Sequence, residues 1–463
     1  MANIFTLMTK QRHFWLYLVT IVASLGGLLA GFDMGVISGA LLFIEDTWPL
    51  DDITKGWVVS SAIVGAVIGA ASNGHFSDVY GRKKIIIATA VIFILGSLLS
   101  AIAPSVGWLI FARMLVGVAV GMVNFIVPIY LSEISPQRIR GMLVSLYQLA
   151  ITAGILFSYL INGVYADSEY SWRLMMFSGI YPAIVLLIGI IFLQDTPRWL
   201  ISKKREKEAE AVFNKIEPET DAKEKIKEIK ETLKAEAKKS KQKLAFQKWM
   251  LTPILVGVGM MFAQICTGIN TIIYYTTTIF KVSGFSANTA AIYATIGVGV
   301  VNFLMTVVAI VWVDRWGRKP LLYVGCTGMM LSMICLGASF EYAAVLGENL
   351  KYFATGSVLV YIACFAFSLG PVTWIMVSEI LPLKIRGMAM SVCTVSNFAF
   401  NFIIVLTFPI LLSRIGEAHT FWLYGAICFI SLFFIYFYVP ETKGRSLEEI
   451  EKNWQNSIPA RKF

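Results

Sequence analysis

Charged side chains are scarce in this chain. Asp, Glu, Lys and Arg together make up 15% of its 463 residues, whereas 57% of the residues are hydrophobic. Soluble globular domains carry about 25% charged residues, so a chain this poor in charge cannot cover its surface in water. The scarcity excludes an ordinary soluble protein and favours an integral membrane protein.

Histidine and cysteine are also too few and too dispersed for a catalytic or metal centre. His13, His75 and His419 stand far apart, and no nucleophile lies in an arrangement with a base. The six cysteines fall inside long apolar stretches, without the spacing of a metal site or a disulfide framework. We therefore expect no enzymatic activity, no metal and no cofactor.

Long apolar stretches are abundant instead. A helix needs about 20 mainly apolar residues to cross a bilayer, and we find about twelve such stretches. The first is too long for a cleavable signal peptide and lacks a small-residue cleavage site. The predicted spans are 15–42, 56–77, 84–103, 107–132, 141–164, 173–194, 250–280, 289–313, 320–340, 353–378, 387–411 and 420–439.

The formal net charge of +10 is distributed unevenly between the loops. Lys and Arg gather in alternate loops, whereas loops such as 45–52 and 165–170 are acidic or neutral. Because positively charged loops stay in the cytoplasm, we expect both termini there, in a multi-pass protein of the inner membrane. The basic balance is thus a topology signal, and we expect no nucleic-acid partner.

Two strings of residues occur twice. "DVYGRKK" (78–84) returns as "DRWGRKP" (314–320), and "SEISPQRIRGM" (132–142) returns as "SEILPLKIRGM" (378–388). The repeat predicts two homologous six-helix halves with a substrate path between them. We assign the first half to 1–197, a cytoplasmic helical linker to 198–248, the second half to 249–440 and a cytoplasmic tail to 441–463.

These repeated strings, together with "GFDMGVISG" (31–39), "QDTPRWL" (194–200), "GINTIIYY" (268–275), "GPVTWIMVSE" (370–379) and "PETKGRSLEE" (440–449), identify a family. The chain resembles the sugar porter family of the major facilitator superfamily over nearly its whole length. The resemblance implies an all-α membrane protein with the major facilitator fold, alternating access and a monosaccharide or similar polyol as substrate. We expect one chain in the bilayer to act as a monomer.

Asp33 and Arg113 are charged residues deep inside predicted spans of the first half. At about 1.5 Å per helical residue they lie roughly 14 and 9 Å below the outer surface, a gap that an arginine side chain can bridge. Asp can take up a proton and Arg cannot lose one, so the pair is a candidate proton switch. In sugar porters an acid at this position is associated with proton symport. A static ion pair that fixes helix packing is the alternative.

Paired acids and bases follow the repeated spans. In sugar porters the corresponding residues lock the inner side while the outer side is open, and ordinary topology anchoring explains only the basic ones. The candidate cytoplasmic gate is Asp78, Arg82, Glu133 and Arg140 in the first half, with Asp314, Arg318, Glu379 and Arg386 in the second.

Amides and one aromatic ring inside the spans suit an uncharged sugar. Asn and Gln both donate and accept hydrogen bonds, and a ring covers the apolar face of a sugar. Gly268 allows a helix break between two of these amides. Interhelical hydrogen bonding is the alternative role. The positions that match the family's sugar contacts are Gln148, Gln264, Asn270, Asn302, Trp374, Asn397 and Asn401.

Three positions depart from the common family pattern. Ala30 stands where many members have Phe, Ile265 where a second Gln is common, and Phe398 where Trp is common. These pocket-lining differences predict an altered pocket. Tyr274 and Tyr275 match the extracellular gate of relatives.

The sequence thus predicts a proton-coupled sugar transporter. The alternatives are a proton-independent facilitator, a polyol transporter such as one for inositol, and a membrane sugar sensor.

Overall fold

The computed structural model describes residues 2–135, 140–216, 222–240, 247–456 and 458–462. Side chains are described for these residues except 2–17, 140–145, 235–240, 313–314 and 462. The first half consists of α1 (Ala2–Thr47), α2 (Asp52–Tyr80), α3 (Arg82–Ala101), α4 (Val106–Ile134), α5 (Arg140–Tyr165), α6 (Ser171–Phe177) and α7 (Ile180–Phe192). The second half consists of α11 (Leu251–Cys266), α12 (Ile269–Val282), α13 (Asn288–Trp316), α14 (Arg318–Glu341), α15 (Ala343–Leu346), α16 (Leu350–Phe367), α17 (Leu369–Ile380) and α18 (Arg386–Tyr438).

Shorter helices connect and follow the two halves. They are α8 (Pro197–Ser202), α9 (Glu206–Ile216) and α10 (Ala222–Ser240) between the halves, and α19 (Leu447–Gln455) near the C-terminus. Within the first three, Trp199, Leu200, Val212 and Ile226 form a small apolar cluster of their own. The described part of the predicted linker is therefore mainly helical.

The prediction of twelve spans is confirmed once one long helix is divided. Eleven stretches of the described chain are long and apolar enough to cross a membrane, and the last, Leu383–Tyr438, has 56 residues. As one helix it would be about 84 Å long, far more than the hydrocarbon core of about 30 Å. Gly416, at φ 80° and ψ 167°, interrupts α18, so this stretch forms two spans.

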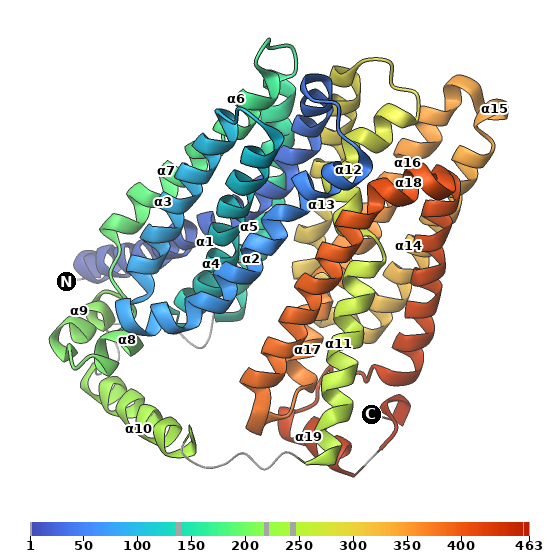
Figure 1. Ribbon diagram of the computed structural model, residues 1–463. Coiled ribbons are helices and arrows are strands. Elements are labelled where there is room, and N and C mark those ends of the chain that lie inside the picture. Colours follow the sequence, from blue (N-terminus) through green and yellow to red (C-terminus); the bar gives the residue numbers. More distant parts are fainter. Residues whose placement is uncertain (1, 136–139, 217–221, 241–246, 457, 463) are drawn as a thin grey trace.

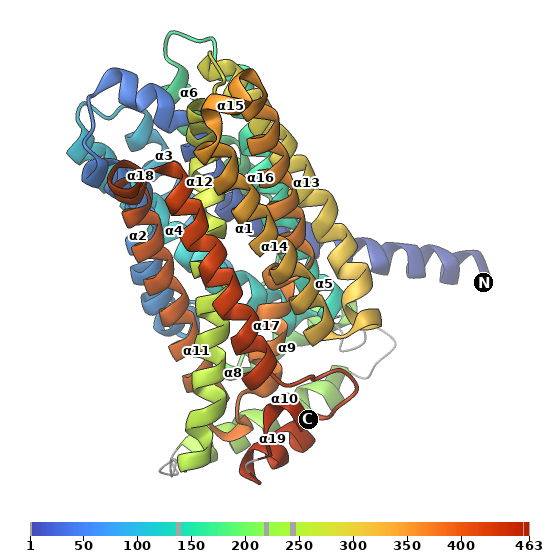
Figure 2. The ribbon, with the colours of Figure 1, turned by 90° about the vertical axis from the view of Figure 1, so that its right-hand side faces the viewer.

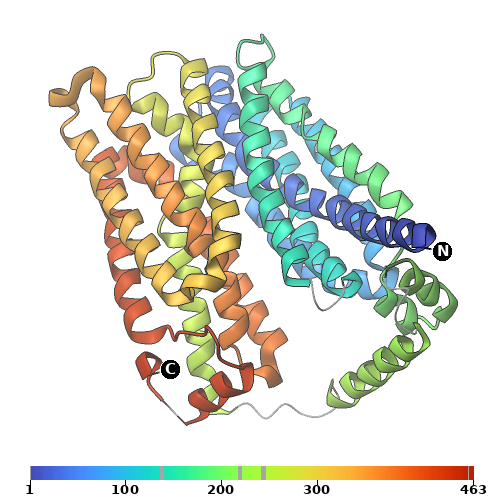
Figure 3. The same ribbon diagram turned by 180° about the vertical axis from the view of Figure 1, so that it is seen from behind.

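The two halves lie side by side and approach each other at one end (Figure 1). We call the end with α8–α10 and α19 the linker end, and the other the opposite end. The ribbons converge at the opposite end and diverge at the linker end, as the view from behind also shows (Figure 3). Across the interface α1 contacts α12, α5 contacts α13 and α2 contacts α18; Figure 2 shows the last pair side by side.

Glycines at a spacing of four residues bring α1 against α5. A Cβ atom at Gly31 would overlap the carbonyl oxygen of Ile151, and one at Gly35 would overlap Oγ of Ser158. Small residues at this spacing let the backbones of membrane helices approach closely. The glycine row thereby fixes the depth and rotation of α1, the helix that carries Asp33.

Two helix breaks shape the second half. The break expected at Gly268 is confirmed, because α11 ends at Cys266, α12 begins at Ile269, and Gly268 has φ +98°, a left-handed conformation that favours glycine. The second break was not predicted. It lies at Ser368, between α16 and α17, where φ is −122° and ψ is −97°.

Candidate functional site

Asp33 and Arg113 meet inside the first half, from α1 and α4. Nη1 of Arg113 donates to Oδ1 of Asp33, and the two residues are 1% and 4% exposed, Arg113 being the more deeply buried. The partnership expected from their depths in the spans is therefore present in the structure. Each ion is out of water, so its partner must compensate for most of the lost hydration.

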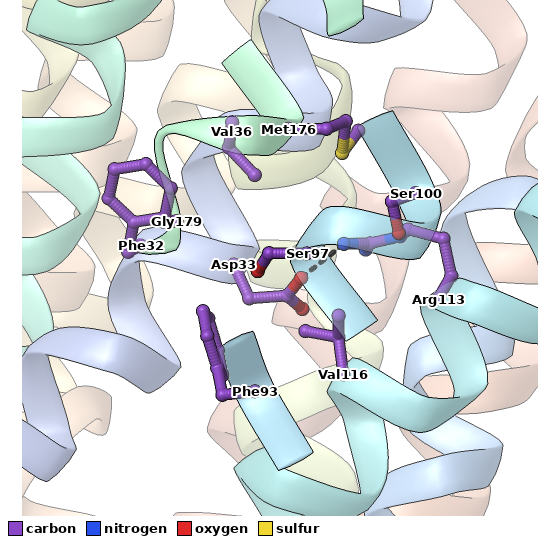
Figure 4. Close-up of a pocket in the computed structure, with 10 residues that line it drawn as sticks. All are labelled: Phe32, Asp33, Val36, Phe93, Ser97, Ser100, Arg113, Val116, Met176 and Gly179. Atoms are coloured by element: carbon purple, nitrogen blue, oxygen red, sulfur yellow. Dashed lines mark hydrogen bonds and ion pairs between the residues drawn. The ribbon is translucent and has the colours of Figure 1, made fainter. Parts of the chain in front are cut away.

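A small cavity of about 10 Å³ adjoins the pair, room for about one water molecule. Figure 4 shows the two charged side chains pointing toward each other, with Ser97 and Ser100 of α3 beside them. Phe93, Val116 and Met176 supply apolar walls. Nε and Nη2 of Arg113 have no hydrogen-bond partner among the described residues. The guanidinium thus depends on one carboxylate.

This arrangement can respond to a proton. Of the ten residues that line the cavity, Asp33 and Arg113 are the two with charged side chains. Protonation of Asp33 would leave Arg113 without its counter-charge in a site that water barely enters. Removal of one member of a buried pair costs about 3–5 kcal/mol, enough to favour a different arrangement of α1 and α4.

The candidate sugar-binding amides fall into two groups. Gln264 and Asn397 belong to a network, in which Nδ2 of Asn397 donates to Oε1 of Gln264 over 3.0 Å. Nε2 of Gln264 donates to the carbonyl oxygens of Leu369 and Gly370, over 3.2 and 3.1 Å. Gln264 therefore ties α11 and α18 to the first turn of α17, just after the break at Ser368.

The remaining amides keep unused hydrogen-bonding groups. The side chains of Asn270 and Asn302 make no hydrogen bond to the described residues, and Oδ1 of Asn401 is buried without a partner. Gln148, on α5 of the first half, is half-buried. Trp374 is 38% exposed, so part of its surface is not covered by packing. These groups are available to an uncharged ligand that both donates and accepts hydrogen bonds.

The remaining predicted pocket and gate positions are mostly covered by neighbours. Ala30 and Ile265 are buried, and Phe398 is half-buried against the second-half core. Tyr275 donates to the carbonyl oxygen of Val405 over 3.1 Å within its own half. Tyr274 is 5% exposed. Their pocket and gate roles stay predictions.

In each half, the gate arginines whose side chains the structure describes bind acceptors of the same half. Arg82 forms two hydrogen bonds with Glu133, of 3.1 and 3.0 Å, and one of 3.1 Å with Asp78. In the second half Arg318 lies 3.4 Å from Glu379, and Arg386 donates to the carbonyl oxygen of Ser378 over 2.6 Å. The side chains of Arg140 and Asp314 lie outside the described residues.

Two acids that the sequence analysis missed complete this charge arrangement. Asp195 accepts hydrogen bonds from the backbone N–H groups of Arg82 and Lys83, at 2.8 and 3.2 Å. Glu441 accepts from the backbone N–H groups of Arg318 and Lys319, at 3.2 and 2.9 Å. Both acids thus bind the first turn of a repeated helix, where the helix dipole favours negative charge.

A signal for these acids was present in the sequence. Asp195 and Glu441 are separated by 246 residues, the offset that also separates Glu133 from Glu379, and each is followed by Thr. Thr196 donates to Oε2 of Glu133 over 2.6 Å. Burial raises the pKa of the Asp195 carboxyl above its usual value, against the backbone N–H groups of Lys83, Arg82 and Thr196 and the charge of Arg82, which lower it.

Comparisons with known proteins agree with this architecture. A family model described as "Sugar (and other) transporter" matches residues 19–454. The chain is 42% identical to the putative metabolite transport protein YwtG of Bacillus subtilis, with 96% of each chain covered. It is 41% identical to the galactose-proton symporter of Escherichia coli K12, with 94% of each covered. The inward open structure of the xylose transporter XylE from E. coli has a TM-score of 0.83 and 32% identity, covering 95% of this chain and all of that one.

Proposed function

The chain belongs to the sugar transporter family of membrane proteins, and from that premise we propose that it moves a monosaccharide, a hexose or a pentose, together with a proton. Its place is the cytoplasmic inner membrane. No cofactor takes part, and the proton is the coupling ion. One chain supplies the ion pair and all seven candidate sugar-binding residues, so the monomer is the functional unit.

The buried pair of Asp33 and Arg113 is the observation that carries proton coupling. A carboxylate at this depth is expensive, and its guanidinium partner has no second acceptor among the described residues. Proton uptake by Asp33 and release of Arg113 therefore occur together. Because α1 and α4 both belong to the first half, this event changes how the helices of that half pack.

The arrangement of the halves supports alternating access. Their ribbons converge at the opposite end and diverge at the linker end (Figure 1). The loops of the linker end carry the Lys and Arg excess, and such loops face the cytoplasm. We place both termini there, so this conformation faces inward. The gate charges at that end, of which Arg82 and Arg318 bind acids of their own half here, would join the halves when the transporter faces outward.

The sugar is held between the halves by the second-half amides and by Gln148. Asn270, Asn302 and Asn401 have hydrogen-bonding groups without a partner among the described residues, and the partly exposed ring of Trp374 covers an apolar sugar face. Gln264 and Asn397 contribute from their network. Ala30, Ile265 and Phe398 adjust the shape of the pocket.

A panel of uptake assays tests this proposal. Labelled pentoses, hexoses and polyols are offered to proteoliposomes that contain the protein, with and without a protonophore. We expect one sugar to accumulate against its gradient and the accumulation to vanish with the protonophore. Accumulation of a polyol alone would change the substrate class, and uptake insensitive to the protonophore would establish a facilitator.

A further inference from the structure

Two hydroxyl groups of the first half hold one turn of α12 in the second half. Oγ of Ser38, on α1, lies 2.9 Å from Oγ1 of Thr277 and also accepts from the backbone N–H of Thr277 at 3.3 Å. Oη of Tyr159, on α5, donates to the carbonyl oxygen of Ile273 over 2.9 Å. Both contacts join the halves near the opposite end, at the two ends of the same helical turn.

The proton of each hydroxyl can be assigned by counting donors. Thr295, on α13, donates to the carbonyl oxygen of Ala291 over 2.8 Å, so its oxygen accepts from Thr277, 3.3 Å away. The single hydroxyl proton of Thr277 is therefore used in the bond to Thr295. Ser38 must then be the donor in its bond with Thr277. The result is a directed chain from α1 through α12 to α13.

The groups of this chain are excluded from solvent. Ser38 is fully buried, and Thr277, Thr295 and Tyr159 are each 1% exposed. A buried hydroxyl that loses its partner without gaining water is left unsatisfied, which is unfavourable. Separation of the halves at this end must break the contacts of Ser38 and Tyr159, whereas the bond between Thr277 and Thr295 lies within the second half and can persist.

We infer that Ser38, Tyr159 and Thr277 form a hydroxyl latch that sets the ratio of conformations open and closed at the opposite end. The inference rests on the proposed function in that the transporter alternates between these conformations. The three are positioning residues, since they act on the halves and not on the sugar. Ser38 follows Asp33 by five residues on α1. A movement of α1 that follows protonation of Asp33 therefore also moves Ser38.

The ratio can be measured without sugar. Spin labels are attached at Asp167→Cys in the first half and Val345→Cys in the second, both exposed near the opposite end. The background carries Cys335→Ser and Cys364→Ala, because the other four cysteines are buried. Pulsed electron resonance on the full-length protein then gives the populations with short and long label distances.

Thr277→Val and Tyr159→Phe each remove one hydroxyl bond of the latch, and Ser38→Ala removes both contacts of Ser38 Oγ with Thr277. We expect each to raise the ratio of open to closed about threefold, the effect of one interhelical hydrogen bond in a membrane. Ser38→Ala combined with Thr277→Val should not exceed Ser38→Ala alone, because Ser38→Ala already removes both contacts between these two residues. Thr277→Ser should keep the wild-type ratio.

Thr271→Val is the matched control. Thr271 is a buried threonine on the same helix whose hydroxyl lies 3.4 Å from Tyr424, within the second half. Its loss should leave the ratio unchanged. Equal ratios for Thr277→Val and Thr271→Val would overturn the latch. A wild type that takes up no sugar would overturn the proposed function alone, because the label distances are measured without sugar or a proton gradient.

Discussion

Asn397 donates a hydrogen bond to Gln264, with 3.0 Å between Nδ2 and Oε1, and Gln264 in turn donates to two carbonyl oxygens at the start of α17. Gln264 is therefore a structural link as well as a candidate sugar ligand. Asn302 makes no such bond within the described residues. Gln264 and Asn302, which look alike as candidate ligands in the sequence, thus differ in their structural roles.

This difference can be measured by truncating each amide. Gln264→Ala should lower the thermal unfolding temperature in detergent, because Asn397 and two carbonyl groups lose a partner at a cost of about 1–3 kcal/mol. It should also raise KM for the sugar. Asn302→Ala should raise KM about fivefold, the effect of one hydrogen bond, at an unchanged unfolding temperature. Equal unfolding temperatures for both variants would contradict the structural role of Gln264.

The ion pair predicts a non-additive pair of substitutions. Arg113→Met leaves Asp33 buried without its counter-charge, which should cost about 3–5 kcal/mol of stability. Adding Asp33→Asn removes the stranded carboxylate, so the double variant should regain most of that loss. Thermal unfolding in detergent at pH 8 measures both variants. A double variant less stable than Arg113→Met would show that the charges do not compensate each other.

Asp195 predicts a dependence of stability on pH. Burial raises its pKa above the usual value of 3.8, so folding favours the protonated form. This preference contributes its full stabilisation below pH 3.8, the pKa of the unfolded chain. The contribution is lost as the pH rises through the raised pKa of the folded state. Asp195→Asn keeps an uncharged acceptor at every pH. Between pH 4 and pH 7 the thermal unfolding temperature of the wild type should therefore fall relative to that of this variant. Parallel curves would contradict the raised pKa.

The sequence alone predicted the architecture because apolar length and the internal repeat report on it directly. Twelve spans followed from hydropathy, and the partnership of Asp33 and Arg113 followed from their similar depths. The break at Gly268 was predictable because a glycine lay between two amides that a regular helix would separate. Each of these features can be recognised from the residue types in one or two short stretches of the sequence.

Other features depend on contacts between distant segments. Ser368 itself resembles any serine in a membrane helix, but Gly370 and Pro371 follow it, and a Gly-Pro pair is a helix-breaking signal that was not used in the prediction. Ser38 and Thr277 are 239 residues apart, and buried hydroxyls usually bond to their own helix, as Thr295 does. Asp195 and Glu441 could have been found from their shared offset, but their role as acceptors at helix starts required the structure.

Proton coupling through Asp33 is the central claim, and Asp33→Asn tests it most directly. Proteoliposomes with the variant are given a sugar that the wild type accumulates, first with an inward proton gradient and then with equal unlabelled and labelled sugar on the two sides. We expect uphill accumulation to disappear while exchange of labelled for unlabelled sugar continues. Proton-driven accumulation at the wild-type level in Asp33→Asn would contradict it.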